Sequence, residues 1–108
     1  MEIRYQEEMI RTIDGLMAAD RLVNRHVLAF GHCHATEVMI DHLLDRGVRV
    51  NGILDNNRSK QGSAYQGIPI VPPQAVRRLA GEEAIVLIAT RYYEPMVAQL
   101  RELGFAGN

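Results

Sequence analysis

Hydrophobic residues near the start of the chain recur at helical rather than strand spacing. Charged residues separate the apolar positions, which return at three- and four-residue steps: Met9, Ile13, Leu16, Met17, Leu22 and Val23. This periodicity predicts an amphipathic helix from about Tyr5 to Asn24, within an N-terminal segment of residues 1–24. Its apolar stripe is expected to cover the sheet of the domain or to pack on a partner.

Short continuous apolar runs follow and alternate with helical patterns. Continuous apolarity is typical of strands buried on both faces, and it predicts strands over residues 26–31, 48–55, 68–71 and 84–90. Helical patterns occupy residues 35–46, 72–79 and 94–103, with Gly47 at a helix C-cap position. The polar stretch 56–64 predicts a loop. The alternation predicts an α/β fold with a four-stranded, mainly parallel sheet and helices on both faces.

Length and composition limit the class of protein. With 108 residues, of which 47% are hydrophobic and 23% charged, the chain is expected to form one globular domain whose core spans residues 26–104. The 12 basic and 13 acidic residues give a net charge of −1, which offers no broad attraction to nucleic acid. No apolar run is long enough to span a membrane, and the N-terminus is acidic where a signal peptide is basic, so a cytoplasmic location is expected.

The turn after the first predicted strand carries the most chemistry. In a doubly wound sheet it lies at the carboxyl end of a central strand, where the next helix offers N–H groups and its positive dipole end to an anion. Gly31 matches the first glycine of a G-x-G-x-x-G motif, but Cys33 and Thr36 replace the other two, so the tight dinucleotide fingerprint is broken. His32 and His34 are expected to line the pocket as hydrogen-bond donors. A plain strand–helix turn is the alternative.

The cluster of His32, Cys33 and His34 also raises two chemical alternatives. Consecutive residues converge poorly on one metal ion, and because Cys33 is the only cysteine, a zinc site of several cysteines is excluded. A Cys–His nucleophile pair would need a third residue to orient the base, and the sequence shows none. We therefore expect no metal site and assign no catalytic residue.

Polar residues follow the second predicted strand. Asp55 comes 24 positions after Gly31, close to the interval at which an acidic residue accepts hydrogen bonds from a ribose. Asn56 adjoins it, and Arg58 and Lys60 are candidates for a phosphate contact or for plain solvation.

The end of the fourth predicted strand should reach the same edge of the sheet. Thr90, Arg91 and Tyr92 follow this strand directly. Arg91 could pair with a phosphate, and Tyr92 could stack on a base or sugar. Together with Gly31 and Asp55, these residues predict one ligand site built from three strand ends.

Several of these segments together resemble a known group of modules. The segments are Phe30-Gly31, Gly52-Ile53-Leu54-Asp55-Asn56-Asn57, Lys60-Gln61-Gly62 and Gly67-Ile68-Pro69-Ile70-Val71-Pro72. They resemble Rossmann-like domains of bacterial sugar and polysaccharide biosynthesis proteins. Such domains form the N-terminal part of β-helical sugar acyltransferases, the cofactor-binding part of nucleotide-sugar dehydratases, and the C-terminal part of certain sugar C-methyltransferases. The similarity covers about Val27 to Gly104.

The resemblance implies a small three-layer Rossmann-like domain that holds a nucleotide or nucleotide sugar between the Gly31 turn, Asp55 and the Thr90–Arg91 loop. No hexapeptide repeats are present, so acyl transfer is not implied. We expect a binding module without a complete active site of its own, acting as a homodimer or beside a larger partner enzyme. The alternatives are the cofactor-binding domain of an NAD(P)-dependent oxidoreductase or sugar-modifying transferase, and a protein–protein interaction module.

Overall fold

The computed structural model describes residues 2–23, 25–79, 84–90 and 93–105 and confirms the α/β class. Helices and strands alternate along most of this chain. In order they are α1 (Glu2–Ala18), β1 (His26–Phe30), α2 (His34–Asp45), β2 (Gly52–Leu54), β3 (Ala64–Tyr65), β4 (Ile68–Val71), the 3-10 turn η1 (Pro73–Ala75), α3 (Val76–Leu79), β5 (Ala84–Leu87) and α4 (Glu94–Glu102).

The strands form one mixed, five-stranded sheet in the order β3-β4-β2-β1-β5. Strands β4, β2, β1 and β5 run parallel, as predicted, but β3 pairs antiparallel with β4. The prediction of four strands was therefore wrong. The predicted loop over residues 56–64 was wrong at its last residue, because Ala64 already belongs to β3. Gln66 and Gly67 have φ angles of 52° and 77° and form a two-residue turn. Positive φ at both central residues is typical of the tight hairpin that brings a strand back beside its neighbour.

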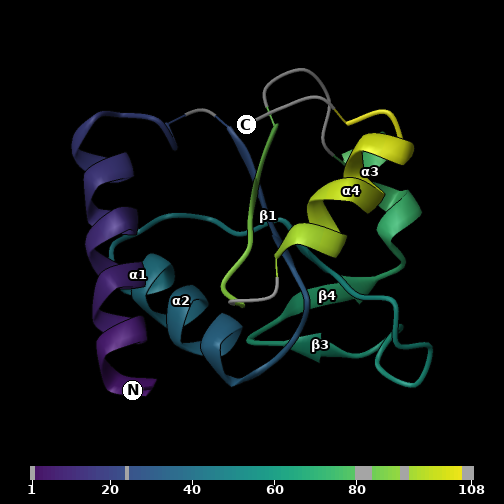
Figure 1. Ribbon diagram of the computed structural model, residues 1–108, viewed down its shortest axis with the longest axis horizontal. Coiled ribbons are helices and arrows are strands. Elements are labelled where there is room, and N and C mark those ends of the chain that lie inside the picture. Colours follow the sequence, from purple (N-terminus) through teal and green to yellow (C-terminus); the bar gives the residue numbers. More distant parts are fainter. Residues whose placement is uncertain (1, 24, 80–83, 91–92, 106–108) are drawn as a thin grey trace.

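Two hydrophobic clusters lie on opposite faces of the sheet. Along β1, Val27 and Ala29 belong to one cluster, whereas Leu28 and Phe30 belong to the other. Figure 1 shows α1 and α2 on one side of the strands and α3 and α4 on the other. Because β1 is covered on both faces, all its apolar residues are buried, which explains its continuous rather than alternating hydrophobicity.

The apolar stripe of α1 packs onto the domain. Ile13 is only 3% exposed, and Met9, Leu16 and Met17 are partly buried against the same cluster. The helix ends at Ala18, earlier than predicted, since Asp20 adopts a φ of 56°. The N–H groups of Asp20 and Arg21 donate to the carbonyls of Met17 and Leu16, which is the Schellman pattern of helix termination.

Glycines end α2 and α4 in the same way. Gly47 has a φ of 78°, and the N–H groups of Gly47 and Val48 donate to the carbonyls of Leu44 and Leu43. This arrangement confirms the predicted C-cap role of Gly47. The chain then returns at once toward the sheet to begin β2.

Strands β2 and β5 are shorter than their hydrophobic runs. Val50 and Ala89 are buried, at 6% and 0% exposed, but lie outside any strand. Burial of an apolar side chain does not require ladder pairing of its backbone, so hydrophobicity alone overestimates strand length. None of the helices within the described residues is long and apolar enough to cross a membrane.

Candidate functional site

The carboxyl ends of β1 and β2 meet at one edge of the sheet, beside the end of β5. The N–H of Gly31 donates to the carbonyl of Leu54 over 2.7 Å, which aligns the turn after β1 with the end of β2. A pocket of about 540 Å³ opens there. It is lined by Phe30, Gly31, His32, Cys33, Asp55, Asn56, Asn57, Lys60, Thr90 and Met96. The structure thus brings together parts of all three predicted segments.

The position of this pocket follows from the order of the strands. From β1 the chain moves outward through β2 to β4, and then returns to place β5 on the other side of β1. The crossovers therefore diverge at β1, and the loops after β1 and β5 leave a space between them. Open α/β sheets bind ligands at such a switch point, outside the carboxyl ends of the strands.

The carboxylate of Asp55 links the two loops of the site through hydrogen bonds. Its Oδ2 accepts a hydrogen bond of 2.7 Å from the N–H of His32, and its Oδ1 accepts one of 2.7 Å from the N–H of Asn57. Both carboxylate oxygens are thus engaged by backbone donors. Each oxygen keeps further lone-pair capacity toward the pocket that Asp55 lines.

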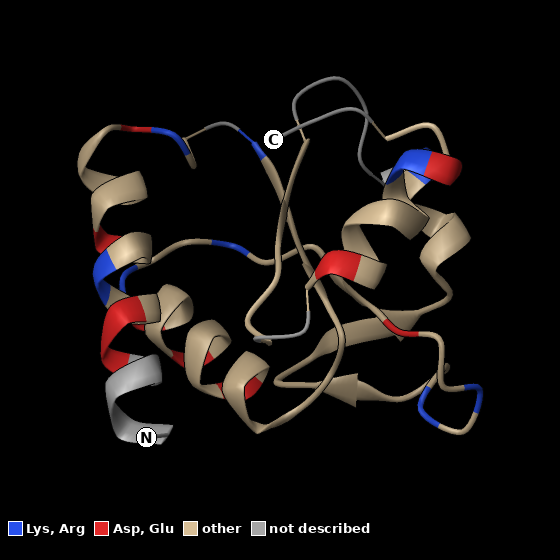
Figure 2. Ribbon diagram, in the orientation of Figure 1, with Lys and Arg blue, Asp and Glu red and all other residues tan. Residues whose placement is uncertain are grey.

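Lys60 supplies a positive charge within the pocket lining. Its Nζ donates over 2.7 Å to the carbonyl of His32, so the loop after β2 folds back onto the turn after β1. Figure 2 shows basic residues on this loop, just beyond the acidic residue that ends β2. An ammonium group has three donors, and one contact leaves two of them for an anionic ligand.

His32 is held on the side of the turn that faces α2 and β3. Its Nε2 lies 2.8 Å from Glu37 Oε2, and its ring centroid lies 5.8 Å from that of Tyr65. Donation to the carboxylate assigns the proton to Nε2. The Nδ1 atom is buried and has no hydrogen-bond partner in the part of the chain that the structure describes.

Tyr65 extends this contact toward α2. Its hydroxyl donates to Asp41 Oδ1 over 2.7 Å. This hydrogen bond stabilises the neutral phenol and, with partial burial, raises the pKa of Tyr65 above its ordinary value of 10.0. The antiparallel strand β3, which the sequence did not predict, thus supports one wall of the turn.

Thr36 and Cys33 have different roles at the start of α2. Thr36 is fully buried, and its hydroxyl donates to the carbonyl of Gly31, so it fixes the turn and does not line the pocket. Cys33 is the exposed N-cap residue in extended conformation, with its Sγ 3.4 Å from Thr36 Oγ1. The free N–H groups of the first helical turn begin directly after it.

Met96 of α4 covers Gly31. Gly31 has a φ of 90°, and a Cβ built on it would lie 2.9 Å from Met96 Cε. The thioether therefore lies directly against the turn after β1, on the side of α4. Nothing in the helical pattern of residues 94–103 marks Met96 as part of a site, and sequence reasoning missed it.

Asn56 joins the loop after β2 to α4. Its side-chain amide exchanges two hydrogen bonds with that of Gln99, of 2.9 and 2.8 Å. The pair spans 43 positions of the chain and links the loop after β2 to α4 at an exposed position. Asn56 lies in the pocket lining, and both ends of its amide are already paired with Gln99.

The remaining predicted site residues differ in where the structure places them. His34 and Arg58 are exposed and are not among the residues that line the pocket. Thr90 lies in the pocket lining, whereas Arg91 and Tyr92 fall outside the described residues. Within the described part of the chain, no three histidine, cysteine, aspartate or glutamate side chains are grouped to hold a metal ion.

Comparison with known proteins assigns no relative. No family model matches the chain, and no curated protein matches its sequence. The chemistry of the pocket must therefore be inferred from its own residues.

Proposed function

We propose that this chain is a Rossmann-like module that binds a nucleotide-type ligand, such as a nucleotide sugar, at the carboxyl edge of its sheet. One observation carries the proposal: the pocket at the divergence of β1 and β5 contains the Gly31 turn, Asp55 and Lys60 together. Its volume of about 540 Å³ lies within the range of about 300–1,000 Å³ that is usual for small-molecule sites.

The charges of the pocket support a ligand with both a hydroxylated and an anionic part. Lys60 and the N-terminal turn of α2 favour negative charge, while the carboxylate of Asp55 can accept hydrogen bonds from sugar hydroxyls. A nucleotide sugar carries both groups. NAD and NADP carry both groups as well, so these charges are compatible with either class of ligand.

The module is proposed to present or sense its ligand rather than to transform it. In the described pocket, Asp55 is bonded to two backbone N–H groups and the ring of His32 is turned to Glu37. Neither arrangement pairs a nucleophile with a general base. A role in sugar or polysaccharide biosynthesis, in the cytoplasm and beside a partner enzyme or a second copy, is the setting that this proposal suggests.

Calorimetric titration of the full chain tests the proposal. The ligands are UDP-glucose, UDP-N-acetylglucosamine, NAD, NADP, coenzyme A and S-adenosylmethionine. We expect a UDP-sugar to bind with a dissociation constant below about 1 mM, which is roughly 4 kcal/mol of binding free energy. Absence of heat from every compound at millimolar concentration would remove the proposal, and turnover of any of them by the isolated chain would contradict the binding-only role.

Two charge variants of one loop locate the site. Lys60→Gln removes a cation that lines the pocket, and Arg58→Gln removes one from the same loop that does not. Both variants change the net charge equally. A difference between them therefore reports a direct contact of Lys60 with the ligand rather than the overall electrostatic field of the protein. We expect Lys60→Gln to weaken binding about tenfold and Arg58→Gln by less than about twofold.

A further inference from the structure

A second cavity lies at the opposite, amino-terminal edge of the sheet. Its volume is about 490 Å³, close to that of the pocket at Gly31. Residues from two chain segments line it: Leu22, Val23, Arg25 and His26 between α1 and β1, and Gly47, Val48, Arg49 and Asn51 between α2 and β2. The cavity shares no lining residue with the site described above.

Basic and donor side chains dominate the polar lining of this cavity. Arg25, His26 and Arg49 are exposed and line it, and among the described residues of its lining there is no carboxylate. Within the described residues, neither arginine makes an ion pair. A local cluster of this kind attracts anions even though the whole chain carries a net charge of −1.

Asn51 adds a donor rather than an acceptor. Its Oδ1 accepts a hydrogen bond of 3.2 Å from the N–H of Val27, while its backbone N–H donates to the carbonyl of Val27. The oxygen is therefore used to extend the pairing of β1 with β2. The amide NH₂ group of the same side chain is available to donate to a ligand.

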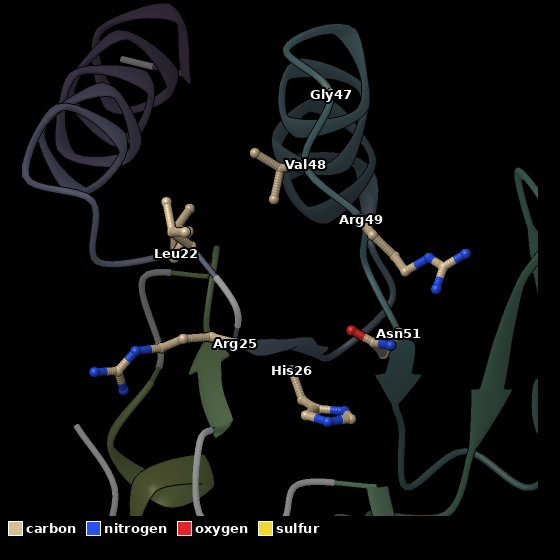
Figure 3. A pocket seen from close by; sticks show the side chains of 8 residues that line it. Leu22, Arg25, His26, Gly47, Val48, Arg49 and Asn51 are labelled. Atoms are coloured by element: carbon tan, nitrogen blue, oxygen red, sulfur yellow. The ribbon is translucent and has the colours of Figure 1, made fainter.

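The other part of the lining is apolar. Leu22 is 6% exposed, Val48 is half-buried, and Val23 is 57% exposed. Figure 3 shows Leu22 and Val48 facing each other across the opening, with Arg25 and Arg49 extending to its two sides. Because both arginines are exposed, a change of rotamer can bring either guanidinium group to a bound anion.

We propose that this cavity binds a small amphiphilic anion, in which a carboxylate or phosphate is joined to a short apolar group. The apolar part would rest on Leu22, Val23 and Val48, and the head would accept hydrogen bonds from Arg25, Arg49 and Asn51. Arginine forms paired hydrogen bonds with carboxylates and with phosphates, so both heads fit the same donors. The site is separate from the pocket at Gly31 and shares none of the described lining residues with it.

NMR titration of the full ¹⁵N-labelled chain tests this second site. The probes are hexanoate, hexyl phosphate and inorganic phosphate. We expect amide shifts at residues 22–26 and 47–51, with dissociation constants of about 1–10 mM for the hexyl compounds and at least about fivefold weaker binding of inorganic phosphate. The stronger of the two hexyl compounds identifies the preferred head group.

Matched variants complete the test. The double variant R25Q/R49Q should weaken binding of the better probe about tenfold, whereas R78Q/R101Q removes the same charge from exposed positions outside the cavity and should leave it within about twofold. Three results would each overturn the proposal. They are an equal loss of affinity in both double variants, equal affinity for inorganic phosphate and hexyl phosphate, and amide shifts confined to residues 31–36 and 55–60.

Discussion

Asp55 and His32 are joined by a hydrogen bond of 2.7 Å from the backbone N–H of His32 to Oδ2 of Asp55, across 23 positions of the chain. The contact links the ends of the two central strands, and the second oxygen of the same carboxylate binds the N–H of Asn57. Asp55 is therefore a structural residue of the site edge, whatever ligand the pocket holds.

Replacement of Asp55 by alanine should destabilise the domain. The change leaves the partly buried N–H of His32 and the exposed N–H of Asn57 without their charged acceptor, and we expect a loss of about 2 kcal/mol in the free energy of unfolding. Urea denaturation followed by circular dichroism measures it. Arg58→Ala, on the exposed part of the same loop, is the control and should change stability by less than about 0.5 kcal/mol. Equal stability of both variants would show that Asp55 does not hold the turn.

Gly31 should tolerate no side chain. A Gly31→Ala variant places a Cβ at a φ of 90° and 2.9 Å from Met96 Cε, so we expect a loss of about 1–3 kcal/mol. Because Met96 also packs against the second hydrophobic cluster, the collision is isolated by comparing Met96→Ala with Gly31→Ala/Met96→Ala: in the Met96→Ala background the Gly31→Ala change should cost less, since only the backbone strain remains. Gly15→Ala is the contrasting case, since its Cβ would meet nothing within 4 Å inside α1, and it should stabilise by about 1 kcal/mol. Thermal denaturation of these variants measures their order of stability.

The docking of α1 should depend on an ionic contact with α2. His42 Nε2 lies 2.7 Å from Asp14 Oδ1, and Arg46 Nε lies 3.5 Å from the same oxygen. Asp14→Ala should lower the free energy of unfolding by about 1 kcal/mol. It should also raise amide exchange in residues 7–18 more than in β1. Asp45→Ala, whose carboxylate is mostly exposed, is the control. Unchanged exchange of α1 would mean that its apolar stripe alone holds it.

The phenol of Tyr65 should ionise above the ordinary range. Because the hydrogen bond to Asp41 raises the folded-state pKa, the stabilisation is complete below pH 10.0 and is lost as pH rises through the shifted value. Ultraviolet titration of the chain, with Tyr65→Phe subtracted, isolates this residue from the other tyrosines. Asp41→Asn should move the pKa of Tyr65 downward. A midpoint at or below 10.0 in the unaltered chain would contradict the contact.

Local signals in the sequence were informative where a single residue determines the backbone conformation. Gly47 marks the end of α2 because its φ of 78° suits a residue without a Cβ. The same signal failed at Asp20, which adopts a φ of 56° and ends α1 at Ala18, since aspartate also tolerates this conformation. Gln66 and Gly67 could not be identified as a hairpin turn from the sequence alone. The antiparallel pairing of β3 with β4 shows that they form one.

The hydrophobic pattern by itself determined the α/β class, the parallel pairing of the main strands and the edge at which Gly31, Asp55 and Thr90 gather. It could do so because buried strands and amphipathic helices have different periods, and parallel strands carry their carboxyl ends to one side. Only the tertiary structure decided that Thr36 is buried, that Met96 lies over Gly31, and that Asn56 is paired with Gln99. Those contacts join positions distant in the chain, and their geometry depends on how α2 and α4 pack, which no local pattern encodes.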